Sequence, residues 1–347
     1  MMSGMNRRTF LGVTGLFGAA LLAGCSGGQG SSSAASASAL ASASASSQAS
    51  GGSAAATASF TVGTLATEDL LPLWVAQDRG LFDGGGVQVE IVPFQSATEL
   101  IAGVASGEVD LAMTDIMVTA SMFASGIDVQ MQWVTLGATA DQGRFGIMVG
   151  PDSSITKLTD LAGVPIGVGS NTILEYVMDK LMEDAGVADD QIVVEELQKL
   201  PVRYQAMASG EVAAAALPGT LLALGEANNC KLIADDTQGD NLSQSVMIVR
   251  SDVLSAADAQ AGIAALEAVW DEAAKLVNAD PESYREILID SASLPIEIAD
   301  TYPISTYPTA ALPTSAMVDP VLDWMQQKGY LTQSLSYDEK TGAFATK

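Results

Sequence analysis

A repeated sequence constrains the fold of this chain more than any other feature. The five residues Ala-Ser-Gly-Glu-Val occur at 105–109 and again at 208–212, and Gln95 and Gln198 are separated by the same offset of 103 residues. Each copy follows a helical pattern and precedes an apolar run, so its glycine stands where the end of a helix needs a left-handed residue. Two unrelated βα units can share such a turn, but five identical residues in register favour an internal duplication.

The segments around the two copies predict two units of the same construction. In the first half, strands are expected at 60–63, 87–92 and 109–113, and helices at 71–78 and 98–105. In the second half, strands are expected at 165–168, 191–194 and 212–217, and helices at 172–183 and 202–208. Each half then has the order β-α-β-α-β, which predicts an α/β fold with two mainly parallel sheets flanked by helices. Ligand sites of such sheets lie at the carboxyl ends of the strands.

The first 24 residues have the layout of a signal peptide. Arg7 and Arg8 precede an uncharged apolar stretch at 10–23, which is too short for a good transmembrane helix. The stretch ends in Leu-Ala-Gly-Cys, which resembles a lipobox, so we expect cleavage after residue 24 and a lipid on Cys25. The paired arginines with the following Thr-Phe-Leu also resemble a twin-arginine motif, and export by that route or by the Sec route stays open.

The segment 25–59 consists almost entirely of Ser, Ala and Gly. Such a segment cannot bury enough apolar surface to offset its chain entropy, so we expect a disordered, flexible tether between membrane and folded protein. The remainder, from 60 to 347, is long enough for one large or two modest domains.

Charge and composition exclude several partners and chemistries. The chain has 15 Lys and Arg against 41 Asp and Glu, a net charge of −26, which repels nucleic acid and anionic lipid. Membrane attachment is therefore expected only through the lipid on Cys25. The absence of His removes the commonest general base and the commonest zinc ligand. Catalysis by carboxylates stays possible in principle, but we expect no catalytic residue, metal or cofactor. Cys230 has no partner once Cys25 is acylated, and we interpret it as a packing residue.

Several segments resemble, in order, the solute-binding proteins of the nitrate/sulfonate/taurine (SsuA-like) and thiamine-precursor group. Residues 71–82, LPLWVAQDRGLF, resemble the N-terminal motif of that family. Residues 158–168, LTDLAGVPIGV, resemble the motif with which its second lobe begins. Both Ser-Gly-Glu turns fit its pattern, although Ala213 stands where the family usually has Asp, and 324–331 resembles its C-terminal helix. The resemblance covers about 60–340. It implies the type II periplasmic-binding fold, with two α/β lobes joined by two hinge crossings.

Under that fold we expect the crossings near 146–150 and 245–250. The expected division is a signal peptide at 1–24, a lipidated tether at 25–59, lobe 1 at 60–147 plus 248–347, and lobe 2 at 148–247. Apolar residues at helical spacing also predict a long helix at 256–278, which Asp280-Pro281 ends.

The resemblance also implies a function. We expect an exported monomer on the extracytoplasmic side of the cell membrane that captures a small-molecule solute and delivers it to an ABC permease and ATPase. A ligand-sensing module for a membrane receptor is the first alternative. An enzyme is the second, but relatives that make the thiamine pyrimidine use a His, and this chain has none.

In this fold the ligand lies between the lobes, against loops that follow strands and against helix N-termini with unpaired N–H groups. The candidate ligand-binding residues of lobe 1 are Glu68, Asp69, Gln95, Ser96, Thr98, Thr114, Asp115 and Thr139. Those of lobe 2 are Ser170, Asn171, Thr172, Arg203, Leu217 and Pro218. Plain helix capping is the alternative for Asp115 and for 170–172. For Arg203 the alternative is a solvated side chain or one paired with a neighbouring Glu.

Charge in lobe 1 favours one class of ligand. Between Ser26 and Gln142 the only basic residue is Arg79, whereas the candidate loops carry Glu68, Asp69, Glu99 and Asp115. This favours a neutral, zwitterionic or amine-bearing ligand, such as a pyrimidine. The solute itself, whether a sulfonate, nitrate, a thiamine-type pyrimidine or another molecule, stays open.

Overall fold

The computed structural model describes residues 58–256 and 258–347. The predicted signal peptide, Cys25 and almost all of the predicted tether lie outside the described residues. Within the described part of the chain, no helix is both long enough and apolar enough to cross a membrane.

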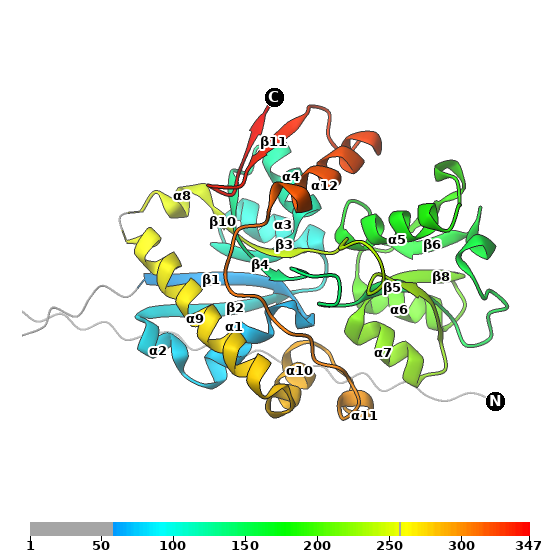
Figure 1. The fold of residues 1–347 in the computed structure, drawn as a ribbon, viewed down its shortest axis with the longest axis horizontal. Helices are drawn as coiled ribbons and strands as arrows, with labels where there is room; N and C mark the ends of the chain where they lie inside the picture. Colours follow the sequence, from blue (N-terminus) through cyan, green and yellow to red (C-terminus); the bar gives the residue numbers. More distant parts are fainter. Residues whose placement is uncertain (1–57, 257) are drawn as a thin grey trace, which may run out of the picture. The chain divides into compact units, whose positions relative to one another are not determined.

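In the described residues, seven strands form the larger of two sheets (Figure 1). They are β1 (Ala58–Leu65), β2 (Val87–Phe94), β3 (Leu111–Asp115), β4 (Val129–Leu136), β10 (Ser245–Arg250), β11 (Leu335–Asp338) and β12 (Ala343–Thr346). Their order across the sheet is β11-β12-β4-β10-β3-β1-β2. β1 pairs in parallel with β2 and β3, and β10 runs antiparallel between β3 and β4.

The second sheet repeats this plan with five strands. They are β5 (Phe145–Val149), β6 (Pro165–Val168), β7 (Val193–Glu196), β8 (Ala214–Pro218) and β9 (Lys231–Asp235). Their order is β7-β6-β8-β5-β9, with β6 parallel to β7 and β8, and β5 antiparallel between β8 and β9. The order β2-β1-β3-β10-β4 of the first sheet therefore recurs strand by strand. The two α/β units are confirmed, but both sheets are mixed rather than mainly parallel. β10 and β12 in the first sheet and β5 in the second run antiparallel to their neighbours, which the sequence did not predict.

The two Ser-Gly-Glu turns occupy equivalent positions in the two sheets. The first connects α3 (Ala97–Ser106) to β3, and the second connects α6 (Leu200–Ala208) to β8. Gly107 has a φ of +80° and Gly210 a φ of +75°, the left-handed region that glycine adopts at low cost. The duplication inferred from the repeated sequence is confirmed.

The chain passes from the first sheet to the second in 137–144, which connects β4 to β5. It returns in 236–244, which connects β9 to β10. The crossings expected at 146–150 and 245–250 instead fall within the antiparallel strands β5 and β10. From here on, lobe 1 denotes 58–136 with the described residues of 245–347, and lobe 2 denotes 145–235.

Helices cover both sheets. Those of lobe 1 are α1 (Leu71–Asp78), α2 (Leu81–Gly85), α3, α4 (Ile116–Ala124), α8 (Ser251–Leu254), α9 (Ala259–Ala279), α10 (Arg285–Ser291), α11 (Ile296–Ala299) and α12 (Ser315–Gln327). Those of lobe 2 are α5 (Ile173–Asp184), α6 and α7 (Gly219–Ala227). The long helix predicted at 256–278 is α9, which packs on α1, and the centroids of its Trp270 ring and of the Trp133 ring in β4 are 5.9 Å apart.

One apolar core runs through both lobes. It contains Met117 of α4 and Val321 of α12 in lobe 1 together with Val177 of α5 in lobe 2. Cys230 is buried in a smaller cluster within lobe 2, as expected for a packing residue.

Candidate functional site

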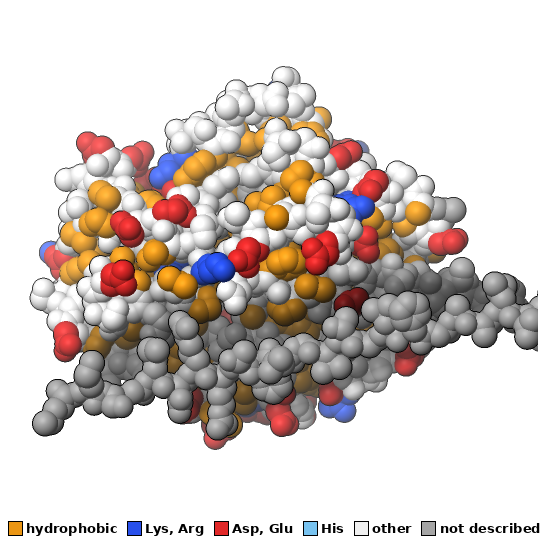
Figure 2. Space-filling view, turned by 180° about the vertical axis from the view of Figure 1, so that it is seen from behind, with side chains coloured by type: hydrophobic (Ala, Val, Ile, Leu, Met, Phe, Trp, Pro, Cys, Tyr) orange, Lys and Arg blue, Asp and Glu red, His pale blue; other side chains and the backbone are white. Residues whose placement is uncertain are grey.

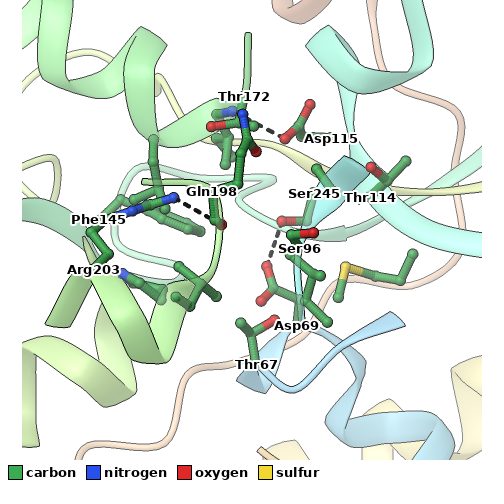
Figure 3. A pocket seen from close by; sticks show the side chains of 17 residues that line it. Thr67, Asp69, Ser96, Thr114, Asp115, Phe145, Thr172, Gln198, Arg203 and Ser245 are labelled. Atoms are coloured by element: carbon green, nitrogen blue, oxygen red, sulfur yellow. Dashed lines mark hydrogen bonds between the residues drawn. The ribbon is translucent and has the colours of Figure 1, made fainter. Parts of the chain in front are cut away.

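A pocket lies where strand ends of both sheets meet (Figure 3). Its walls come from the carboxyl ends of parallel strands and from the residues that follow them, and Phe145 and Ser245 begin the antiparallel strands of the two sheets. Figure 3 shows Asp69, Ser96 and Thr114 on one side, facing Phe145, Gln198 and Arg203 on the other. The pocket is therefore placed where open α/β sheets bind ligands.

Half of the predicted ligand-binding residues line this pocket. They are Asp69, Ser96, Thr114, Asp115, Thr172, Arg203 and Pro218. The others lie outside its lining: Glu68, Gln95, Thr98, Thr139, Ser170, Asn171 and Leu217. Gln95 lines a neighbouring hollow, and Leu217 is buried in the core of lobe 2. Which of these residues contact a ligand stays a prediction.

The remaining lining residues were not predicted, and most of them are apolar. They are Leu65, Thr67, Ala97, Met113, Phe145, Ile173, Leu174, Gln198, Leu200 and Ser245. Half of them lie within two residues of a predicted polar position, because the apolar neighbours of a polar loop residue also reach the pocket. The offset of 103 residues pairs Gln198 with the predicted Gln95, so the sequence repeat contains a signal for Gln198.

Asp115 joins the N-termini of two helices from different lobes. Its Oδ1 accepts a hydrogen bond of 2.7 Å from the Val118 N–H as the N-cap of α4, and its Oδ2 accepts one of 3.0 Å from the Ile173 N–H at the start of α5. Burial raises the pKa of the carboxyl to about 6, although these hydrogen bonds oppose the shift. Helix N-termini stabilise negative charge, so the ionised form suits this place. Asp115 is thus a cap, as the alternative interpretation held, and it also lines the pocket.

Asp69 is a second buried carboxylate in the lining. Its side chain is 4% exposed, and its Oδ1 accepts a hydrogen bond from the hydroxyl of Ser245. Among the described residues, no Lys or Arg forms a salt bridge with Asp69, Asp115 or the neighbouring Glu68. The lobe 1 side of the pocket therefore carries acidic groups without a cationic partner.

Glu68 reaches across to lobe 2 beside the pocket. A Cβ at Gly219, the first residue of α7, would lie 2.7 Å from Glu68 Oε1 and 2.6 Å from the Tyr302 hydroxyl, so only glycine permits this close approach. Burial raises the pKa of Glu68 to about 8 and the hydrogen bond with Tyr302 opposes the shift, so the carboxyl is mainly protonated at neutral pH. Its Oε2 is buried without a hydrogen-bond partner.

Arg203 is a buried cation held by main-chain oxygens. It is 2% exposed, and its Nε, Nη1 and Nη2 donate to the carbonyls of Leu197, Ala216 and Gln198 at 2.8, 3.0 and 3.3 Å. Burial lowers its pKa to about 10, so it stays charged at neutral pH. Neither alternative for Arg203, solvation or a salt bridge with a neighbouring Glu, is found, because three carbonyls fix the buried guanidinium between the β7 loop and β8.

Further contacts hold the rims of the two lobes together. The Asn171 amide donates to Ser121 Oγ at 2.6 Å, and Lys199 Nζ is 2.8 Å from Glu99 Oε1. The Lys328 ammonium, just after α12, is 2.9 Å from Asp179 of α5. With these contacts formed, the lobes are closed on each other around the pocket.

The comparisons with known proteins identify the family. A family model described as NMT1/THI5 like matches residues 67–283, which is more than half of the chain. The chain belongs to the NMT1/THI5-like family. The resemblance to the nitrate/sulfonate/taurine and thiamine-precursor group is thereby confirmed. No protein among the curated sequences matches this chain.

Solved structures show the same fold. The alkanesulfonate-binding protein SsuA from Xanthomonas axonopodis pv. citri, bound to MOPS, has a TM-score of 0.67 and 18% identity over 80% of this chain and 95% of that one. The aliphatic sulphonate binding protein SsuA from Escherichia coli has a TM-score of 0.65 and 16% identity over 80% and 94%. The desulfurization enzyme DszB has a TM-score of 0.59 and 15% identity over 80% and 94%. These identities establish the two-lobed type II fold and nothing finer.

Proposed function

We propose that this protein is an extracytoplasmic solute-binding protein, which encloses a small organic molecule between its lobes and delivers it to an ABC importer. The observation that carries the proposal is the pocket itself, lined by both lobes at their strand ends and closed by contacts such as Asp115 to the Ile173 N–H. Such an arrangement suits reversible capture, because each lobe supplies part of the binding surface and closure brings the two parts together. The names of the SsuA structures, which are binding proteins, support the same function.

The sequence supports a location outside the cytoplasm. We propose that Arg7 and Arg8 begin an export signal and that 25–59 is a tether, lipidated on Cys25, between the membrane and the folded domain. The partners would be the permease and ATPase of an importer, with the binding protein acting as a monomer.

We propose no catalytic role, although DszB shows that an enzyme can have this fold. The chain has no His. The carboxylate of Asp115 accepts two main-chain hydrogen bonds, and the guanidinium of Arg203 donates to three carbonyls. The Asp115 carboxylate and the Arg203 guanidinium are thus engaged in holding the protein together.

A binding screen tests this function. Purified protein without its signal peptide is mixed with a panel of small organic solutes, and stabilisation is followed by thermal shift and calorimetry. We expect a binder at one site per chain, whose affinity is lost when Ala97→Trp fills the pocket and kept when the same change is made at Ala261, an exposed position of α9. A binder that is unaffected by Ala97→Trp would place the site elsewhere.

A further inference from the structure

The pocket assigns a class to the solute, an inference that rests on the proposed function. We propose that the protein binds a small organic cation, with a protonated amine or a similar N–H group held by Asp69, and that it rejects solutes with an anionic head group such as a sulfonate. Three observations support the inference. Asp69 has no cationic partner among the described residues, the Asp115 carboxylate already occupies a helix N-terminus, and Arg203 is held by main-chain carbonyls.

Asp69 is the acceptor that such a ligand would use. Its side chain is 4% exposed and lines the pocket, and Ser245 supplies a hydrogen bond to Oδ1 only. A buried carboxylate is costly unless it is paired, and no Lys or Arg of the described residues forms a salt bridge with it. A cation in the pocket supplies the missing partner.

The protein's own carboxylate occupies the place where an anionic solute would bind. The N-terminus of α5 faces lobe 1, and a helix N-terminus is a ready site for a sulfonate or phosphate. Here the Ile173 N–H donates to Asp115 Oδ2 at 3.0 Å, so the position is filled from inside the chain. At α7, the Glu68 carboxyl of lobe 1 lies against the first residue, Gly219. An anionic solute beside Asp115 would be repelled by the negative charge of the Asp115 carboxylate.

Arg203 does not offset these acidic groups. Among the described residues it is the only Lys or Arg in the pocket lining, and its Nε, Nη1 and Nη2 each donate one hydrogen bond to a main-chain carbonyl. Turning the guanidinium away from those carbonyls towards a ligand would leave buried main-chain oxygens unpaired. A sulfonate could therefore use only the N–H groups of Arg203 that the carbonyls leave free, and it would lie beside the carboxyl groups of Asp69 and Asp115.

The rest of the lining and the surface agree with this class. Met113, Phe145, Ile173 and Leu174 form an apolar part of the wall, which suits the hydrocarbon body of an amine. On the face shown in Figure 2, Asp and Glu side chains are widespread and Lys and Arg are sparse. A net charge of −26 attracts cations to the protein and repels anions.

Matched pairs of solutes test the inference. Each hydrocarbon body is offered once as an ammonium and once as a sulfonate, for example benzylamine with phenylmethanesulfonate and propylamine with propanesulfonate. Thermal shift and calorimetry are performed on the wild type, on Asp69→Asn, and on the control Asp83→Asn, whose side chain is exposed on α2. We expect binding by amines only, at least a tenfold weaker dissociation constant in Asp69→Asn, and no change in Asp83→Asn.

Two results separate failure of this inference from failure of the proposed function. Binding of sulfonates in preference to their amine partners, or full amine affinity in a folded Asp69→Asn, would overturn the cation assignment and leave a solute-binding protein. Absence of binding by every member of both series and by the wider panel would count against the proposed function itself. If Asp69→Asn does not fold, Ser245→Ala serves instead, since it frees Asp69 Oδ1 and should alter amine affinity without changing net charge.

Discussion

Gly219→Ala is expected to weaken ligand binding by hindering closure of the lobes. The added Cβ would lie 2.6 Å from the Tyr302 hydroxyl and 2.7 Å from Glu68 Oε1, both shorter than any normal contact of a Cβ. Tyr302 and Glu68 are each 4% exposed, so neither has room to withdraw. Overpacking of a filled site costs about 1–3 kcal/mol, which corresponds to an affinity loss of about 5-fold to 150-fold if the open form is unaffected.

Position 219 permits a clean test because its effect should be confined to the closed form. Gly219 is the first residue of α7 and does not have a positive φ, so alanine suits the helix of lobe 2 itself. Calorimetry with the tightest solute gives the affinity, and small-angle scattering gives the radius of gyration with and without it.

The matched control is Gly84→Ala in α2, where an added Cβ meets nothing within 4 Å. We expect Gly84→Ala to bind and compact like the wild type. If Gly219→Ala does the same, the close approach of Glu68 to α7 is not part of the bound form, and the reasoning from lobe closure fails.

Three further predictions concern single groups. Asp115→Asn should lower the free energy of unfolding by about 1–3 kcal/mol at pH 8 in a urea titration. The reason is that asparagine has one uncharged side-chain oxygen, whereas the two carboxylate oxygens of Asp115 accept from the Val118 and the Ile173 N–H. An unchanged midpoint relative to Asp83→Asn would contradict the bridging role. The pKa of Glu68 is raised from 4.5 to about 8, so the folded protein binds its proton more tightly than the unfolded chain, and stability should fall as pH rises between these values. Glu68→Gln should therefore flatten the plot of melting temperature against pH over this range. Tyr302, Asp69 and Arg144 also affect the pKa of Glu68. Equal slopes for the wild type and Glu68→Gln would refute the assignment. Cys25→Ser should move the protein from the membrane fraction to the soluble fraction, and mass spectrometry that finds no lipid on Cys25 of the wild type would contradict this.

The sequence predicted the fold well because its periodic patterns are local. The helix expected at 71–78 is α1, and the strand expected at 165–168 is β6, both with the predicted ends. The antiparallel strands β5 and β10 were missed, because a buried apolar run gives no sign of its direction or of its neighbours. The expected crossings were shifted into these two strands for the same reason.

The candidate site was predicted less completely because it depends on how two lobes meet. Loops after strands were the right places to look, and Asp69, Ser96 and Asp115 line the pocket. That Asp115 caps one helix was predictable, but its second bond to the Ile173 N–H joins residues far apart in sequence. The positive charge of Arg203 was compatible with a ligand contact or with an ion pair. Its three carbonyl partners come from the loop after β7 and from β8, and they are visible only in the structure.

A crystal structure of the protein with its tightest solute tests the central claim most directly. The account predicts one molecule between the lobes, in contact with Asp69 from lobe 1 and Phe145 from lobe 2, with the bond from the Ile173 N–H to Asp115 retained. A solute bound to one lobe only, or outside this pocket, would contradict it.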